Sequence, residues 1–124
     1  MKRDWKVIRL ILEQAEKENL VEYARQANFP EELDLSEDKF LAHIELLVDA
    51  GILRNAAITR NMNGQIVYCE MNSVFITMQG HDLLDALRDS SVWSRIRDKA
   101  ARAGVSISWE FIKAAIPVVM KELL

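Results

Sequence analysis

The fold is decided by residues 36–77, which read SEDKFLAHIELLVDAGILRNAAITRNMNGQIVYCEMNSVFIT. Ser36 is a favourable N-cap, and Glu37-Asp38 places negative charge in the first turn, where the helix dipole favours it. Apolar residues then recur at three- and four-residue steps, which is the helical period. They are Phe40, Leu41, Ile44, Leu47 and Val48. The pattern predicts a helix over about 37–50 that ends at Gly51.

A β-hairpin is predicted directly after this helix. Residues 52–59 and 65–77 are rich in β-branched and aromatic side chains, which favour strands. The connection reads Arg60-Asn61-Met62-Asn63-Gly64. Asn63-Gly64 is a strong tight-turn signal, because both residue types tolerate positive φ.

The residues before position 36 predict one clear helix and one irregular segment. A helix is expected over about 4–18, with Trp5, Ile8, Ile11, Leu12 and Ala15 on one face. In residues 19–35, Tyr23, Phe29 and the stop signal Pro30 favour a short extended piece and a loop over a long helix.

Three helices are predicted after the hairpin. Thr77 is the expected N-cap of a helix over about 78–89, Ser91 of one that ends near 103, and Ser108 of one that reaches the C-terminus. Pro117 is expected to distort the last helix, because its ring and missing N–H interrupt the hydrogen-bond ladder.

Together these elements predict a mostly helical α+β fold. A helix, an extended piece, a capped helix and a two-stranded hairpin follow in the order of a winged helix with its second helix shortened or replaced. We expect one domain, with a winged-helix-like core at 1–77 and a three-helix extension at 78–124 packed on it.

Composition excludes several protein classes. The chain has 124 residues, half of them apolar, and a net charge of −3, which is typical of one globular domain. Its apolar runs are far shorter than the roughly 20 residues of a spanning helix, and charge interrupts its N-terminus, so neither a membrane segment nor a signal peptide is expected. The lone Cys69 excludes an internal disulfide, which predicts a cytoplasmic protein.

Three stretches of the chain resemble a known family. They are residues 1–9, residues 46–53, and residues 76–89 followed by Val92-Trp93. The most specific motif is Thr77-x-x-Gly80-His81-Asp82. In these features the chain resembles domain of unknown function 2513, a bacterial and prophage-associated family whose members are similar to winged-helix proteins. The resemblance implies that fold and a phage-linked origin, and it implies no activity.

The sequence shows no catalytic or metal-binding set. His81 beside Asp82 is the most enzyme-like feature, but adjacent helical residues do not face each other and no nucleophile motif accompanies them. His43, His81 and Cys69 lack metal-ligand spacing, and all four glycines are isolated. We therefore expect no enzyme, no metal and no small-molecule cofactor.

Charge is distributed unevenly along the chain. Residues 13–50 hold eleven acidic and three basic side chains. The helix expected to enter a DNA groove carries Glu37, Asp38, Glu45 and Asp49 against Lys39 alone. Because phosphate neutralisation by Lys and Arg supplies most non-specific DNA affinity, this charge argues against ordinary major-groove binding.

The basic residues lie elsewhere, and they are candidate contacts for nucleic acid or for an acidic partner. They are Lys2, Arg3, Lys6, Arg9, Arg54, Arg60, Arg95, Arg97, Lys99 and Arg102. The alternative interpretation is that they form solvated faces and edge-strand charges.

The last helix is apolar on nearly every side, so it must bury more than one face. It either covers the core of its own domain or forms a dimer or partner interface. The candidate interface residues are Trp109, Ile112, Ile116, Val119, Met120 and Leu123.

These observations predict a non-enzymatic, phage-type binding protein that acts by protein–protein contacts or as an atypical regulator. Its partner is expected to be a protein or a second copy, with DNA possible and no membrane contact. A sequence-specific DNA-binding regulator that uses helix 37–50 with Arg54 and Arg60 is the first alternative. An inhibitor of a host defence complex, in which the acidic segment imitates nucleic acid, is the second.

Overall fold

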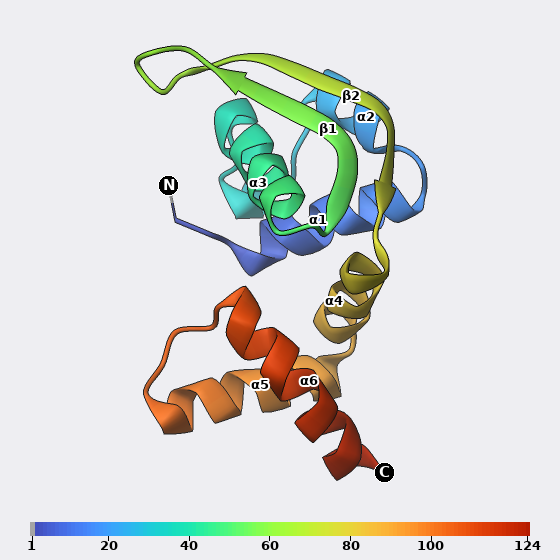
Figure 1. Cartoon of the computed structure of the whole chain (residues 1–124), viewed down its shortest axis with the longest axis vertical. Coiled ribbons are helices and arrows are strands. Elements are labelled where there is room, and N and C mark those ends of the chain that lie inside the picture. Colours follow the sequence, from blue (N-terminus) through green and yellow to red (C-terminus); the bar gives the residue numbers. More distant parts are fainter. Residues whose placement is uncertain (1) are drawn as a thin grey trace. The chain divides into compact units, whose positions relative to one another are not determined.

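The computed structural model describes residues 2–124 and is α+β, mostly helical, with one two-stranded antiparallel sheet (Figure 1). The elements before the sheet are α1 (Trp5–Glu16), α2 (Leu20–Gln26), the short 3₁₀-helix η1 (Glu31–Leu33) and α3 (Glu37–Asp49). Strands β1 (Leu53–Arg60) and β2 (Ile66–Ile76) follow, and then α4 (Met78–Arg88), α5 (Ser90–Ala103) and α6 (Trp109–Leu123). The described residues divide into two compact units, 2–81 and 82–124, with the boundary inside α4.

The first unit is built around α3, which packs against α1 and β1 (Figure 1). Asp4 caps α1 by accepting from the Lys6 N–H, and Ser36 caps α3 by accepting from the Lys39 N–H, so both predicted helices are confirmed. The buried side chains come from the predicted stripes and from the start of β1. They include Ile8, Ile11, Leu12, Phe40, Ile44, Leu47, Ile52 and Leu53. Each contributes about 1.5–3 kcal/mol relative to an exposed position.

The prediction for residues 19–35 is wrong at α2, where a two-turn helix replaces the expected extended piece. Its first residue, Leu20, is buried. The Tyr23 ring lies 5.9 Å from both Phe29 and Phe40, which stack on each other at 4.7 Å. This packing of one helical face on a distant aromatic residue outweighs the local preference of the aromatic residues for extended backbone.

The hairpin confirms the two predicted strands and the place of the turn between them. The Asn61 N–H donates to the Gln65 carbonyl, and the Asn61 side chain accepts from the N–H groups of Asn63 and Gln65. Gly64 has φ +79°, the conformation that its residue type tolerates, whereas Asn63 is not at positive φ. The connection is therefore a short loop that the Asn61 side chain stabilises.

A bulge interrupts the middle of the hairpin. Arg54 pairs with Phe75 but Ala56 pairs with Met71, so β2 has extra residues there. Asn55 and Ser73 both have positive φ, of 68° and 55°, and the Asn55 amide donates to the Ser73 carbonyl at 3.3 Å. A bulge of this kind bends the strand and increases its twist.

The Thr77-x-x-Gly80 motif joins the hairpin to α4. The Thr77 hydroxyl accepts from the Gly80 N–H at 3.2 Å, which confirms the predicted cap, and it lies 2.7 Å from the Gly51 carbonyl, to which it donates. A Cβ at Gly80 would lie 2.5 Å from the Ile52 carbonyl oxygen and from the Ile76 side chain. The motif therefore specifies a helix start that lies directly against the strands.

In the second unit, α5 and α6 pack against each other. Ser108 caps α6 by accepting from the Phe111 N–H, as predicted. The N-cap of α5 is Asp89 rather than Ser91, because the Asp89 carboxylate accepts from the N–H groups of Ser91 and Val92 and its charge is favoured at a helix N-terminus. Helix α6 continues through Pro117.

Candidate interaction surfaces

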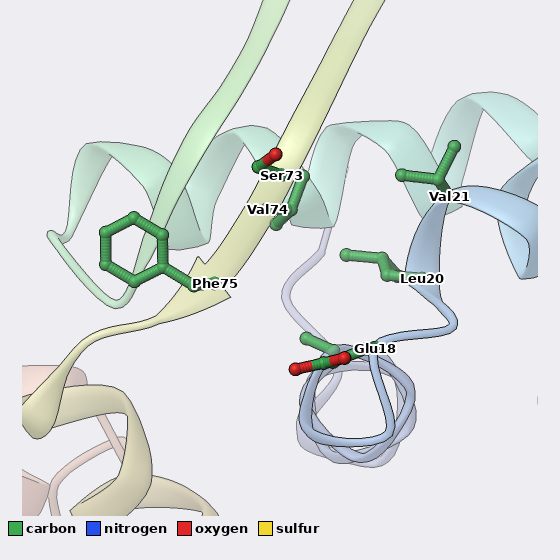
Figure 2. A pocket seen from close by; sticks show the side chains of 7 residues that line it. Glu18, Leu20, Val21, Ser73, Val74 and Phe75 are labelled. Atoms are coloured by element: carbon green, nitrogen blue, oxygen red, sulfur yellow. The ribbon is translucent and has the colours of Figure 1, made fainter.

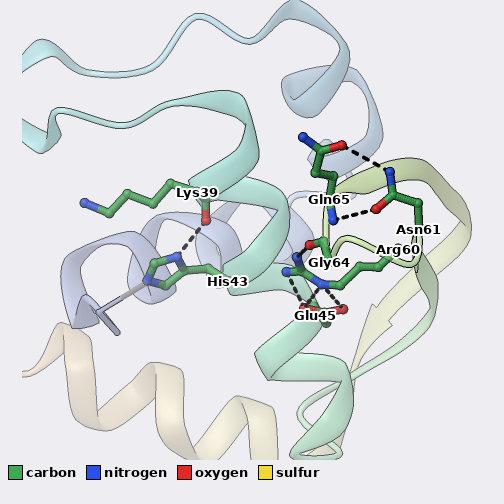
Figure 3. Close-up of polar contacts among 7 residues, drawn as sticks. All are labelled: Lys39, His43, Glu45, Arg60, Asn61, Gly64 and Gln65. Carbon is green, nitrogen blue, oxygen red and sulfur yellow. Dashed lines mark hydrogen bonds and ion pairs between the residues drawn. The ribbon is translucent and has the colours of Figure 1, made fainter.

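The hairpin is tied to α3 by an ion pair. The Arg60 guanidinium binds the Glu45 carboxylate with two N–O distances of 2.8 and 3.0 Å and also donates to the Gly64 carbonyl (Figure 3). The hydrogen bond to Glu45 raises the pKa of Arg60. Arg60, a candidate nucleic-acid contact, is therefore already bound to one of the acids of α3.

The side of α3 that the core does not cover is acidic. Five of its residues are buried: Phe40, Ala42, His43, Ile44 and Leu47. Glu37, Asp38 and Asp49 are exposed. The charges identified in the sequence therefore face solvent, and they would repel the phosphates of a duplex.

A buried histidine holds the start of the chain against α3. His43 Nε2 accepts from the Asp4 N–H at 2.9 Å, so Nδ1 carries the proton and donates to the Lys39 carbonyl at 2.7 Å (Figure 3 shows the second contact). Burial lowers the pKa of His43 below 6.5. Sequence reasoning considered this residue only as a metal ligand, although its place between Phe40 and Leu47 in the apolar stripe signals burial.

Most candidate basic contacts of the first unit lie apart. Arg9 pairs with Glu13 at 2.7 Å, and Arg3 lies over the Trp5 ring at 4.9 Å. Lys6 and Arg54 are exposed on α1 and β1. The structure brings together Lys2 and Arg60, which line one cavity of about 470 Å³ with Lys39. The Lys39 ammonium points away from the Arg60 guanidinium, so these two charges do not meet at one point (Figure 3).

The basic residues of α5 divide into two pairs. Arg95 and Lys99 both bind Glu122 of α6, at 3.4 and 2.6 Å, and this contact lowers the pKa of the Glu122 carboxyl. Arg97 and Arg102 are exposed. Two of the four candidate contacts on this helix therefore hold α5 and α6 together.

A small apolar pocket lies between β2 and the corner that joins α1 to α2 (Figure 2). Its volume is about 370 Å³. Leu20, Val21 and Val74 supply apolar walls, and Glu18 and Ser73, both at positive φ, supply polar ones. The Phe75 ring is turned away from Leu20.

The candidate interface on α6 is partly buried within its own unit. Ile112 and Val119 are fully buried, so they serve the core of the second unit and are not available to a partner. Trp109 and Ile116 are half-buried. Met120 and Leu123 keep 47% and 41% of their surface exposed. Val118 is also exposed, at 48%, but lies on another side of the helix. Ile116, Met120 and Leu123 share one flank of α6, which therefore presents apolar surface to solvent.

A groove runs beside this flank of α6. It is lined by Asp82, Asp85, Ala86, Asp89, Val92, Ile116 and Met120 and has a volume of about 250 Å³. One wall is acidic and the other apolar, and all the residues belong to the second unit. Sequence reasoning placed Asp82 only beside His81, which is exposed. The three- and four-residue spacing of Asp82, Asp85 and Asp89 was a signal for the acidic wall.

Residues 2–124 contain neither a metal-binding cluster nor a helix suited to span a membrane. No group of three or more histidine, cysteine or acidic residues is arranged to hold a metal ion. None of the described helices combines the length and apolar character that crossing a membrane requires.

Comparison with known proteins places the chain in a family. It is 26% identical over 130 residues to a Haemophilus influenzae protein described as "Uncharacterized protein", and the match covers 100% of this chain and 99% of that protein. No solved structure matches the chain. Residues 2–106 match the family described as "Hypothetical protein (DUF2513)", and the match ends before α6 begins at Trp109. The chain belongs to this DUF2513 family.

Proposed function

We propose that the protein is a non-enzymatic binding protein that acts through protein–protein contacts on a winged-helix-like scaffold. The order of three helices and a hairpin, with α3 packed on α1 and β1, supports the scaffold. The helices α4 to α6 form the extension that carries the contact surface.

One observation carries the proposal: α6 has two apolar faces. Ile112, Ala115 and Val119 form the inner face and are buried. Met120 and Leu123 lie on a neighbouring flank and remain exposed beside a groove. A helix flank that keeps large apolar side chains in water next to a concave surface is typical of a contact site for another protein.

Duplex binding through α3 is the second candidate, and the exposed Arg54 on β1 is the observation that favours it. The exposed acids of α3 and the occupied guanidinium of Arg60 weigh against it. A gel-shift titration at two salt concentrations separates the candidates, because binding through Arg54 predicts a steep salt dependence that Arg54→Ala reduces.

Site-specific photo-crosslinking in bacterial cells tests the proposal. A photoreactive residue at Met120 should give protein crosslinks, whereas the same residue at Arg102 of α5, which is exposed and lies outside the groove, should not. Crosslinks at position 120 that disappear with Leu123→Glu support a contact through this flank. Position 120 giving no protein crosslink, or the same crosslinks as position 102, overturns the proposal.

A further inference from the structure

The groove beside α6 has one acidic wall and one apolar wall. Asp82, Asp85 and Asp89 are spaced by three and four residues, so they lie on one face of α4 and at its end. Ile116 and Met120, one helical turn apart on α6, form the opposite wall. A segment that fits this groove needs an apolar residue and a neighbouring cation.

The negative charge of the groove is only partly compensated within the second unit. Asp89 accepts from two N–H groups at the start of α5, and Asp85 pairs with Arg88 at 2.9 Å. Asp82 is exposed and makes no ion pair with another residue of the 2–124 region. The acidic wall therefore still attracts a cation.

The chain itself carries a segment of the complementary chemistry. Lys113 precedes Met120 by seven residues, so both lie on the same face of α6, two turns apart. The Lys113 ammonium lies 2.8 Å from the exposed Glu110 carboxylate and 5.6 Å from the centre of the Trp109 ring. Exposed ion pairs of this type contribute little to stability, so the pair with Glu110 costs little to replace by a contact with another carboxylate. This face of α6 thus presents an apolar side chain, Met120, and an exposed cation, Lys113.

We infer that a second copy of this chain occupies the groove, with the α6 helices of the two copies packed on each other through Met120 and Leu123 and with Lys113 of each copy facing Asp82 and Asp85 of the other. A two-fold axis makes every contact occur twice, so the two copies of the groove contribute to one interface. The inference rests on the proposed function, because both use the exposed flank of α6, and it adds the identity of the partner and the role of the acidic wall.

Sedimentation velocity over a range of protein concentrations, at about 50 and 500 mM salt, tests the inference on the full chain. We expect a concentration-dependent dimer that Met120→Glu abolishes and that high salt weakens. Asp82→Lys should weaken the dimer by roughly ten-fold, because a like charge then faces Lys113 in both halves of the interface. Arg102→Glu, on the exposed face of α5, is the matched charge-reversal control and should change nothing.

A charge swap distinguishes a direct contact from a general effect. Lys113→Glu should weaken the dimer, and Asp82→Lys combined with Lys113→Glu should restore it. Circular dichroism of each variant confirms that α4 and α6 remain folded. A dimer that responds to Met120→Glu but not to the charge at position 82 overturns the inference. A monomer at all concentrations also overturns it, and crosslinks from position 120 to a different protein would then leave the proposed function standing.

Discussion

Arg60 on β1 forms an ion pair with Glu45 on α3, fifteen positions earlier in the chain. The Arg60 Nη2 atom lies 2.8 Å from Glu45 Oε1. The same guanidinium donates to the Gly64 carbonyl in the connecting loop. The pair therefore links the tip of the hairpin to the helix beneath it. It also neutralises one of the acids of α3 and occupies a cation that was a candidate contact for nucleic acid.

Removal of this link should loosen the loop rather than unfold the protein. In Arg60→Ala, the loop 61–65 loses its tie to α3, because both the Glu45 and the Gly64 contacts depend on one guanidinium. We expect faster amide hydrogen exchange at residues 61–65, with exchange in α1 unchanged. Arg54→Ala, which removes an exposed arginine from the same strand, is the control. Equal exchange in the two variants would show that the pair does not restrain the loop.

The substitution Gly80→Ala should destabilise the protein strongly, although it only replaces one hydrogen by a methyl group. The added Cβ would lie 2.5 Å from the Ile52 carbonyl oxygen, which is backbone and has little freedom to move. Overpacking of this kind costs about 1–3 kcal/mol of unfolding free energy, measured by urea denaturation.

The control for this substitution is Gln79→Ala in the same turn of α4. Gln79 is exposed, so its truncation should change the free energy of unfolding by less than about 0.5 kcal/mol. If Gly80→Ala were as stable as Gln79→Ala, the close approach of α4 to the strands would be absent in solution.

The Thr77-x-x-Gly80 motif shows which features the sequence predicts and which it does not. Thr77 is recognisable as a cap from its residue type and position, and the structure confirms it. The close approach at Gly80 involves Ile52, which is distant in the chain, so no local pattern reveals it. Asp89 and Ser91 are both good capping residues two positions apart, and only the geometry of the α4–α5 junction selects Asp89.

The candidate interaction surfaces likewise combine features that local sequence predicts with features that depend on tertiary packing. The acidic character of α3 is a property of its own residues and is predictable from helical spacing. The pairing of Glu45 with Arg60 depends on how far the hairpin bends over α3, which the bulge at Asn55 and Ser73 helps to set. Likewise, an apolar α6 predicts buried faces, but its packing on α5 decides that Ile112 turns inward while Met120 stays exposed.

Protonation of His43 should destabilise the fold under acidic conditions. Its Nε2 atom accepts from the Asp4 N–H, and a protonated ring has no lone pair for that bond. Burial lowers the pKa of His43 in the folded state below the ordinary value of 6.5, so the unfolded chain binds the proton first as the pH falls. The contribution of His43 to stability is therefore complete above pH 6.5 and is lost as the pH decreases through the folded-state pKa.

Urea denaturation between about pH 4.5 and pH 8 measures this effect. The variant His43→Gln should be less stable than the parent chain at neutral pH and should lose stability less steeply on acidification. His81→Gln removes an exposed imidazole and serves as the control. A parent chain and a His43→Gln variant with parallel pH profiles would contradict the assignment of a neutral, hydrogen-bonded His43.

Substitutions on the buried face of α6 should reduce stability, whereas substitutions on its exposed flank should mainly reduce association. Ile112 is fully buried, so Ile112→Ala removes core contacts and leaves a cavity, at a cost of about 2–5 kcal/mol of unfolding free energy. Met120 is nearly half exposed, so Met120→Ala should cost much less. Thermal denaturation at low protein concentration measures both without a contribution from association. If Met120→Ala destabilised the protein as much as Ile112→Ala under these conditions, the exposed flank would belong to the core of the unit, and the proposed contact surface on α6 would lose its physical basis.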